Sequence, residues 1–482
     1  LGTVLESAGY RVEIVDERVT RFFEAEVARS IREERPVMVG ISTMTGMQIK
    51  GGLDAARAIR EVDPRLPIVW GGVHPTLCPD STLKDDFCDI IVKGEGEITI
   101  VELADCLRQG GDLGQIPGVG FKKNGELRYG PYRPMIEDLD VIPRPSYELI
   151  EMDQYFTRAP STDQAQLQVV TSRGCPYDCE FCYNLKFNER RFRSHSAARV
   201  VSDITHVVEQ FGVTAIFIED DYFFGRPRRV EEICDLLLER DLDLLIQVPC
   251  RIDYLHKRSP EMLDKLYRAG FKELWIGIES GSEKRLKEIM KRNTLDQVRE
   301  VNRLIAGSDV YAKYGFMAGF PNEDRNETLD TVDFMFELLK ENPQAGVAPV
   351  AVYTPYPGTT LYDKARLVHG ASFPDTLEGW SHFHFAENNN PFLSPEQSKF
   401  VTKINTISRF FERRAFERFC NNRLKPLLML LYSFYYWYLR LRLRLRFFRF
   451  MPEVPLIRAL ERVYISLFHR TQLSRAGKKP GN

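Results

Sequence analysis

The sequence predicts an α/β protein with two successive series of mostly parallel strands and a helical C-terminal part. Short apolar runs alternate with segments of helical spacing at the start of the chain, and the same alternation begins again after residue 165. A stretch with frequent glycine and proline separates the two series and indicates a linker. The 482 residues are too many for one ordinary domain, and the 43% hydrophobic content excludes a wholly disordered chain.

The first series predicts a doubly wound, Rossmann-like α/β domain over residues 1–125. Apolar runs short enough for buried parallel strands lie at residues 11–15, 37–41, 68–70 and 90–92. Helical spacing is found at residues 2–9, 25–34, 52–62 and 98–108. Because the chain begins with Leu1 and a helix with no strand before it, we expect a truncated N-terminus that lacks a central strand.

The predicted strand ends of this domain carry glycine and polar residues. They are Ser42-Thr43, Gly71-Gly72-Val73-His74-Pro75 and Gly94-Glu95-Gly96-Glu97. In doubly wound sheets, ligands bind at the carboxyl ends of the strands. The sequence therefore predicts a ligand site at this edge, followed by a linker over residues 126–164.

The second series predicts a partial barrel over residues 165–365. Strand-like runs lie at residues 167–171, 214–218, 244–248, 273–277, 312–317 and 348–353. Six β/α repeats fall short of the eight of a complete barrel, so we expect an open (β/α)6 arrangement of TIM type. Its chemistry should lie at the carboxyl ends of the strands.

Three cysteines with CxxxCxxC spacing, Cys175, Cys179 and Cys182, directly follow the first strand of this second series. Thiolates this close in sequence can bind one iron–sulfur cluster from a single loop. When three protein ligands bind a cube of four irons, one iron stays open to a small molecule. In zinc sites an open coordination position likewise distinguishes catalytic from structural sites. A zinc site and three buried structural cysteines are the alternatives.

The cysteine loop resembles that of the radical SAM enzymes, which have an aromatic residue at the position of Phe181. Further segments that resemble signatures of this family lie at the predicted strand ends, at residues 218–221, 277–282, 315–321 and 354–359. The resemblance implies that the three cysteines hold a [4Fe-4S] cluster and that S-adenosylmethionine chelates its fourth iron. Reductive cleavage of S-adenosylmethionine would then give a 5'-deoxyadenosyl radical.

The same resemblance implies a binding site for S-adenosylmethionine, with Glu279 and Ser280 near its ribose or methionine part and residues 315–319 near its adenine. Arg251 would bind the methionine carboxylate through a bidentate pair. The implied contact residues are Phe181, Tyr183, Asp220, Arg251, Glu279, Ser280, Gly315 and Gly319. For Asp220, Asp221 and Arg251 a structural role, such as a helix cap, is the alternative.

The first domain resembles the cobalamin-binding domain that precedes the barrel in the B12-dependent branch of this family. The resemblance rests on residues 5–12, 39–43, 70–75 and 93–97, and it implies cobalamin contacts from Ser42, Thr43, Gly71, Gly72, His74, Gly94, Glu95 and Glu97. The D-x-H-x-x-G signature, whose histidine ligates cobalt, is absent. We therefore expect base-off cobalamin without a protein histidine ligand. A Rossmann-like domain that binds nothing is the alternative.

The C-terminal part is expected to comprise a helical region at residues 366–420 and a basic, aromatic tail at residues 421–482. The tail holds 13 basic and 2 acidic residues, which leaves a net charge of −13 on residues 1–420 and argues against a nucleic-acid partner. Its uncharged run at residues 427–439 is shorter than the ~20 residues that a spanning helix needs. An interfacial membrane anchor and a helix packed on the barrel or at a dimer contact remain as interpretations, because the Arg/Leu alternation predicts no helical stripe.

These features together predict a cobalamin-dependent radical SAM enzyme that methylates an unactivated carbon. One alternative is a cyclase or oxidase without methyl transfer, like the anaerobic magnesium-protoporphyrin ester cyclase that the layout also resembles. Another is a non-catalytic cobalamin-binding or membrane-associated module. The expected partners are a small-molecule substrate, hydrophobic to judge from the tail, and a one-electron reductant such as a flavodoxin or ferredoxin. With no secretory signal and nine cysteines, an odd number, we expect a cytoplasmic protein. If the tail is an interfacial anchor, the protein is also peripheral on the inner face of the membrane.

Overall fold

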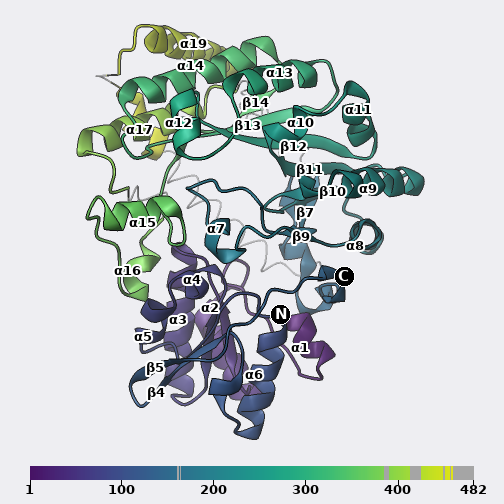
Figure 1. Ribbon diagram of the computed structural model, residues 1–482, viewed down its shortest axis with the longest axis vertical. Coiled ribbons are helices and arrows are strands. Elements are labelled where there is room, and N and C mark those ends of the chain that lie inside the picture. The colour runs from purple at the N-terminus through teal and green to yellow at the C-terminus, as the bar shows by residue number, and fades with distance from the viewer. Residues whose placement is uncertain are drawn as a thin grey trace.

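The computed structural model describes residues 1–159, 162, 164–384, 390–412, 425–448, 451–455 and 457–459. Figure 1 shows a smaller N-terminal domain, in purple and blue, and a larger domain in teal and green. Each domain is built on its own sheet. The two-sheet α/β architecture predicted from the sequence is confirmed.

The N-terminal sheet has five strands in the order β1-β2-β3-β4-β5. Strands β1 (Val39–Ser42), β2 (Ile68–Gly71) and β3 (Ile90–Val92) are parallel, and the hairpin β4 (Val119–Lys123) and β5 (Glu126–Tyr129) is antiparallel. The hairpin extends across residue 125, the expected end of the domain. The sheet is covered by α1 (Gly2–Ser7), α2 (Phe23–Glu34), α3 (Met47–Val62), α4 (Val73–Leu77), α5 (Pro79–Lys84) and α6 (Glu97–Gln109).

The predicted strand at residues 11–15 does not form, so that prediction is wrong. A strand needs a neighbouring strand for its backbone hydrogen bonds. Within the described part of the chain, no backbone hydrogen bond joins residues 11–15 to a strand. Their side chains pair with α2 instead, through Arg11 with Glu34 and Glu13 with Arg29.

The second domain is a curled sheet whose central strands are all parallel. Its order is β14-β13-β12-β11-β10-β7-β6, and β15 pairs with the far end of β13. The bounds are β6 (Thr157–Arg158), β7 (Ala165–Val169), β10 (Ala215–Ile218), β11 (Leu245–Cys250), β12 (Phe271–Glu279), β13 (Tyr311–Ala318), β14 (Gly346–Val347) and β15 (Ala351–Val352). Because β14 and β15 both pair with β13, they share the sixth position, and the six-repeat partial barrel is confirmed.

Alternation along the strands separates the helix-facing side of the sheet from the barrel interior. On β12, Leu274, Ile276 and Ile278 are buried against the surrounding helices, whereas Trp275 and Gly277 face the interior. The covering helices are α8 (Ala197–Phe211), α9 (Pro227–Arg240), α11 (Pro260–Arg268), α13 (Leu295–Ala306) and α14 (Arg325–Glu341), with the short α10 (Ile252–Leu255) and α12 (Glu283–Glu288) at strand ends.

The cysteine loop hangs from the barrel toward the N-terminal domain. A short antiparallel ribbon of β8 (Ser172–Arg173) and β9 (Arg193–Ser194) forms its stem. Within the loop, α7 (Asn184–Phe187) lies against α4 of the N-terminal domain (Figure 1). The stem therefore places the cysteines between the two domains.

The chain after the barrel returns to the N-terminal domain before it rejoins the barrel. It forms α15 (Thr360–Leu367) and α16 (Leu377–Ser381), and α16 packs beside α3. Leu377, Trp380 and Phe383 complete the hydrophobic core of the N-terminal domain. The next helix, α17 (Pro395–Ser408), begins with a capping box at Ser394 and packs against α14. The described part of residues 366–420 is thus divided between the two domains.

The described part of the tail begins with a long helix, α19 (Lys425–Arg444), beside α14 at the end of the barrel farthest from the N-terminal domain (Figure 1). Tyr432, Leu439 and Leu443 are buried on one side of this helix. The prediction of no helical stripe is therefore wrong. The sequence hides the stripe because Arg442 belongs to it, with its guanidinium packed on the rings of Tyr438 and Phe447. Among the described helices, none has the length and apolar character needed to span a bilayer.

Candidate active site

Two aspartates at the end of β10 fasten the cysteine loop to the barrel. Asp220 is buried and accepts hydrogen bonds from Thr171 N (2.6 Å), Thr171 Oγ1 (2.7 Å) and Ser172 Oγ (2.6 Å). Burial raises its pKa above the usual range, although these hydrogen bonds oppose the shift. All these bonds go to the junction of β7 and β8, which is the geometry of a structural anchor. Contact of Asp220 with S-adenosylmethionine stays a prediction.

Asp221 holds both ends of the loop itself. It accepts a hydrogen bond from Gly174 N (2.9 Å), next to the first cysteine, and one from Tyr183 Oη (3.2 Å), next to the last. Asn188 Nδ2 lies 3.4 Å from the same carboxylate. Tyr183 is thereby positioned by Asp221, and its predicted contact with the cosubstrate stays a prediction.

The three cysteine side chains are partly or fully buried within the loop. Cys179 is buried, Cys175 and Cys182 are half-buried, and burial raises the pKa of Cys175 to about 11. Arg251 Nη1 lies 3.4 Å from Cys179 Sγ, where a positive charge stabilises a thiolate. In the described part of the chain, no three His, Cys, Asp or Glu side chains converge closely enough to hold a single metal ion. The three cysteines lie on one loop, as the ligands of a cluster bound by three thiolates do.

Arg251 has its donors engaged inside the site. Its Nε binds Asp253 at 2.9 Å, its Nη2 donates to the carbonyl of Lys291 at 2.7 Å, and the guanidinium lies 3.7 Å from the ring centre of Tyr177. Arg251 therefore joins the end of β11 to the cysteine loop. Its predicted bidentate pair with a carboxylate stays a prediction.

Sequence reasoning missed Lys291, which links two predicted binding residues. Its Nζ forms an ion pair of 2.7 Å with Glu279, and both side chains are nearly buried. The same Nζ lies 5.9 Å above the ring of Phe181. Glu279, at the end of β12, has a φ of 79°, a left-handed conformation that costs free energy and that the ion pair helps to hold. A basic pair, Lys291-Arg292, shortly after the Glu279 signature was the available signal.

The segment around Lys291 packs against the cysteine loop, which stabilises its conformation. Met290 and Arg292 both have left-handed backbone conformations, with φ of 55° and 62°. The amide of Glu180 donates to the carbonyl of Ile289 at 3.1 Å, and Arg292 Nε binds Asp178 at 2.7 Å. These contacts with the loop stabilise a backbone that the segment would not adopt alone.

Aromatic stacking joins two of the signature segments to the residue that precedes a third. Phe181 packs on Phe320, with ring centres 6.3 Å apart, and Phe320 stacks on Tyr353 at 5.0 Å. The aromatic position of the cysteine loop is thus part of a small hydrophobic cluster with the ends of β13 and β15. Nearby, Ser280 is buried with its Oγ 3.3 Å from Thr331 Oγ1, so it ties β12 to α14.

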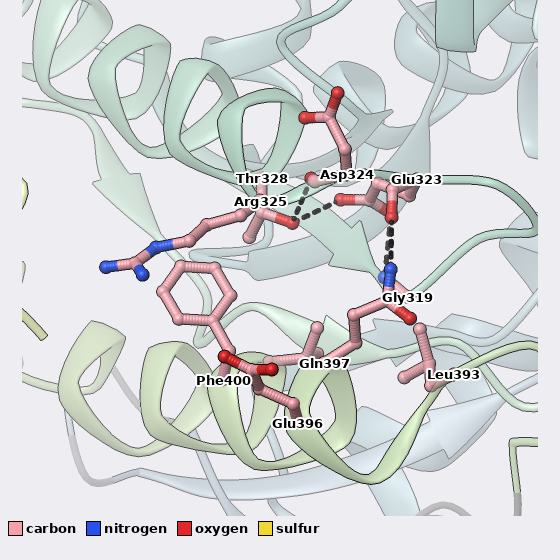
Figure 2. A pocket seen from close by; sticks show the side chains of 10 residues that line it. Gly319, Glu323, Asp324, Arg325, Thr328, Leu393, Glu396, Gln397 and Phe400 are labelled. Carbon is pink, nitrogen blue, oxygen red and sulfur yellow. Dashed lines mark hydrogen bonds between the residues drawn. The ribbon is translucent and has the colours of Figure 1, made fainter. Parts of the chain in front are cut away.

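Two predicted glycines shape the wall of the barrel and its rim. Gly315 on β13 is paired with Gly277 on β12. A Cβ added at Gly315 would meet only backbone atoms, at 3.9 Å, whereas one at Gly277 would clash with Glu279 Oε1, so the open space is at Gly315 and the Glu279–Lys291 pair lies over Gly277. Gly319 donates from its amide to Glu323 (2.7 Å) and accepts from Asn390 Nδ2 (2.6 Å). Figure 2 shows Glu323 reaching Gly319 beside a cavity of about 90 Å³. This cavity is far smaller than the ~300 Å³ of a small ligand pocket, so it is too small to be the cosubstrate site.

The carboxyl edge of the N-terminal sheet suits a large polar ligand. Thr43 and His74 are buried there, and Thr43 Oγ1 and His74 Nε2 have no hydrogen-bond partner among the described residues. Gly72 has a φ of 96°, and a Cβ added there would lie 2.7 Å from the Thr43 carbonyl, so only glycine fits. Around Gly94 no atom lies within 4 Å of an added Cβ, and near Gly71 the closest is at 3.8 Å. Unpartnered polar atoms beside exposed backbone fit the predicted cobalamin edge with Ser42 and Thr43.

His74 lies below the surface of this edge. Its Nδ1 is 3.0 Å from Thr45 Oγ1, and its ring meets Trp380 edge-on at 5.5 Å. Burial lowers the pKa of His74 to about 4, so the imidazole is neutral at ordinary pH. Contact of His74 with cobalamin stays a prediction.

The structure places Glu95 and Glu97 on arginines of the cysteine-loop stem. Glu95 binds Arg173 (2.8 Å) and Arg193 (2.7 Å), and Glu97 binds Arg173 (2.6 Å). Arg173 stands next to the cysteine signature in the sequence, which gave no hint of its partners. Contact of the two glutamates with cobalamin stays a prediction.

Comparison with known proteins gives two family matches. Residues 1–104 match the B12 binding domain and residues 169–335 match the radical SAM superfamily. An uncharacterized methyltransferase of Pyrococcus horikoshii is 32% identical over 356 residues, which cover 73% of this chain and 74% of that protein. The anaerobic magnesium-protoporphyrin IX monomethyl ester cyclase of Rubrivivax gelatinosus is 27% identical over 430 residues, or 86% and 73% of the two chains. The fold is similar to that of the radical S-adenosylmethionine methyltransferase TsrM from Kitasatospora setae, with a TM-score of 0.61, 19% identity and coverage of 76% and 73%.

Proposed function

The chain belongs to the radical SAM superfamily and carries a B12-binding domain, and from this premise we propose that it is a cobalamin-dependent C-methyltransferase. The observation that carries the proposal is the position of the cysteine loop. The β8-β9 stem joins this loop to the barrel, and its helix α7 packs against α4 of the N-terminal domain. An enzyme that uses both cofactors on one carbon needs them to face a common space.

The cofactors are a [4Fe-4S] cluster, S-adenosylmethionine and cobalamin. When bound, the cluster and S-adenosylmethionine supply a 5'-deoxyadenosyl radical, and cobalamin supplies a methyl group. Cys175, Cys179 and Cys182 hold the cluster, and the Arg251 guanidinium donates to the sulfur of Cys179.

The residues near the cosubstrate orient it and exclude water. In our proposal Lys291 and Glu279, paired at 2.7 Å beside Phe181, contact its polar methionine or ribose part. The open space beside Gly315 accommodates the nucleoside. Asp220, Asp221 and Ser280 act through the backbone segments that they hold.

On the other side, the glycine-lined edge at Gly71, Gly72 and Gly94 receives cobalamin, with hydrogen bonds from Ser42 and Thr43. The unpartnered Thr43 Oγ1 supports this role. We propose the base-off form without a histidine ligand, because the buried ring of His74 packs edge-on against Trp380.

A cyclase or oxidase without methyl transfer is the second candidate. The long match to a magnesium-protoporphyrin ester cyclase, over 86% of this chain, favours it. Anaerobic turnover with methyl-labelled S-adenosylmethionine and candidate substrates separates the two reactions. A product heavier by one labelled methyl group supports methyl transfer, whereas deoxyadenosine with an unlabelled, cyclised or oxidised product supports the alternative.

Radical SAM enzymes act on small molecules with an external reductant, and this chain does so as well. We further propose that the reductant is a flavodoxin or ferredoxin, that the substrate is hydrophobic and that the protein is cytoplasmic. Reduction of the cluster by a purified flavodoxin, followed by its visible absorbance, tests the first of these. No reduction by flavodoxin or ferredoxin would contradict it.

We also propose that the outer side of α19 rests on an anionic membrane surface. Exposed apolar side chains recur there with helical spacing, at Leu427, Leu430, Leu431, Phe434, Trp437, Leu441 and Leu445. The exposed Arg440 and Arg444 add charge that complements anionic lipid. Tyr432, Leu439 and Leu443 are buried on another side of the helix, so this stripe stays outward.

Sedimentation with liposomes tests this contact. We expect binding to vesicles with phosphatidylglycerol and loss of binding in the double variant Phe434→Ser/Trp437→Ser. Ser433→Ala, on the same exposed surface, is the matched control and should bind like the wild type. Equal recovery of wild type and double variant with the vesicles, or self-association through this stripe in their absence, would contradict the proposal.

A further inference from the structure

We propose that Glu95, Glu97, Arg173 and Arg193 form an interdomain clasp that sets the position of the cysteine loop relative to the cobalamin domain. The four are positioning residues, because they act through the loop stem and the β3-α6 turn. The clasp goes beyond the proposed reaction and holds equally for methyl transfer and for cyclisation.

The contacts of the clasp join the two domains directly. Arg173 donates from Nη1 to Glu95 (2.8 Å) and from Nη2 to Glu97 (2.6 Å). Arg193 donates from Nη1 to both oxygens of Glu95, at 2.9 and 2.7 Å. Burial opposes ionisation of Glu95, but the hydrogen bonds from Arg193 and Arg173 prevail and its pKa is lowered. Glu95 is thus an anion shared between two guanidinium groups.

The stem of the cysteine loop has unbalanced charge without these glutamates. Arg173 and Arg193 are direct partners across the β8-β9 ribbon. Like charges in this position repel each other. The Arg193 side chain is only 3% exposed, so water cannot screen its charge. The acceptors for Arg193 within the second domain and linker are neutral, namely Asn188 Oδ1 and the Ile136 carbonyl. Glu95 is therefore the anion that makes the closed stem stable.

The glutamates stand on the turn that forms part of the predicted cobalamin edge. Gly94, in a left-handed conformation with a φ of 74°, lets the chain turn from β3 toward the barrel. Its amide donates to Thr76 Oγ1 at 2.9 Å, which ties the turn to α4. Glu97 then begins α6, where the helix N-terminus favours a carboxylate. The backbone of this turn thus forms part of the predicted cobalamin edge, and its side chains bind the cysteine-loop stem.

A consequence of this geometry is that displacement of the N-terminal domain frees the cysteine-loop stem. Cys175 follows Arg173 by two residues, and the cysteine loop lies entirely between the two arginines. Neutralising the glutamates should therefore loosen the loop even while the barrel stays folded. The loop and the β3-α6 turn should loosen together, because each is the other's partner.

Hydrogen exchange of the cofactor-free full chain tests the clasp, so the outcome does not depend on the proposed reaction. We expect the double variant Glu95→Gln/Glu97→Gln to exchange on the order of tenfold faster than the wild type in peptides covering residues 93–97 and 172–194. Peptides of β12 and β13 should be unchanged. Glu102→Gln, which removes a carboxylate of the same helix paired with Arg133, is the matched control and should leave both regions as in the wild type.

Variants that change the charge of the stem and its partners provide a second test of the clasp. Arg173→Lys should keep more protection of residues 172–194 than Arg173→Met. After anaerobic reconstitution, iron loss to a chelator should be several-fold faster for Glu97→Gln than for Glu102→Gln. If Glu95→Gln unfolds the chain, the more exposed Glu97→Gln decides alone. Unchanged exchange and unchanged iron loss in Glu97→Gln would overturn the clasp, as would loosening of only one of the two regions.

Discussion

Arg251 donates a hydrogen bond from Nη1 to the Sγ of Cys179, at 3.4 Å, and so ties the end of β11 to the centre of the cysteine loop. The same guanidinium binds Asp253 and the Lys291 carbonyl and stacks on Tyr177. One side chain therefore connects the sulfur of Cys179, the rest of the cysteine loop and the strained segment after α12. This relationship makes the cysteine loop a preorganised site.

Replacing Arg251 should destabilise the fold and the cluster together. Arg251→Met leaves the mostly buried Asp253 without its partner, so we expect a loss of about 3 kcal/mol in the free energy of unfolding. Arg292→Met removes an exposed pair with Asp178 on the same loop and should cost much less. Denaturant unfolding of the cofactor-free chains measures both. A cost for Arg251→Met no larger than that for Arg292→Met would contradict this role.

Asp220 should prove to be structural. Asp220→Asn weakens the charge-assisted hydrogen bonds to Thr171 and Ser172, so we expect a loss of about 2 to 3 kcal/mol in stability. S-adenosylmethionine affinity, measured by equilibrium dialysis on the reconstituted protein, should change by less than about twofold. A large drop in affinity at unchanged stability would instead place Asp220 in contact with the cosubstrate.

Replacing Lys291 should impair the cleavage of S-adenosylmethionine. Lys291→Met removes the ion pair with Glu279, and we expect deoxyadenosine formation to fall on the order of a hundredfold, with iron content unchanged. Lys287→Met, on α12, is the matched control with wild-type rates. Liquid chromatography of anaerobic reactions gives both rates. Full activity of Lys291→Met would remove this residue from the binding site.

The buried His74 should make the N-terminal domain sensitive to acid. Because burial lowers its pKa from 6.5 to about 4, the unfolded chain binds more protons than the folded one between these values. Burial of His74 therefore leaves the free energy of unfolding unchanged above about pH 6.5 and lowers it by about 3 kcal/mol as the pH falls toward 4. In denaturant titrations, His74→Gln should lose stability less steeply than the wild type over this window. Parallel curves for the two proteins would contradict the assignment.

The contact between α16 and the N-terminal domain should be essential to that domain. Trp380 is 2% exposed and packs with Phe383 in the domain core, so Trp380→Ala should cost about 3 to 5 kcal/mol. Hydrogen exchange should show the loss in α3, which lies beside α16. Tyr132→Ala, at an exposed aromatic side chain, is a control without such an effect. Loosening confined to α16 itself would contradict the contribution to the core.

Local patterns in the sequence were enough to predict the barrel and the cysteine loop. Strand periodicity and the spacing of Cys175, Cys179 and Cys182 involve residues close in the chain, so folding does not alter their meaning. The same is true of the glycine-bearing strand ends at Gly71 and Gly94. Residues 11–15 have a strand-like pattern, but a strand forms only beside a partner, and periodicity does not report partners.

Contacts between distant residues were beyond such patterns. Glu95 and Arg173 are 78 positions apart, and nothing in either local sequence indicates the other. Trp380 lies about 300 residues from the core that it completes. The stripe on α19 was missed for another reason: Arg442 is buried by packing on aromatic rings, which a division into polar and apolar residues cannot anticipate.

The central claim is that the three cysteines leave one iron open for S-adenosylmethionine. Low-temperature electron paramagnetic resonance of the reduced, reconstituted protein tests it most directly. We predict the signal of a [4Fe-4S] cluster whose g-values shift when S-adenosylmethionine is added, and loss of this signal in Cys179→Ala but not in Cys106→Ser. A spectrum that S-adenosylmethionine leaves unchanged, or a protein that holds zinc in place of iron, would contradict the account.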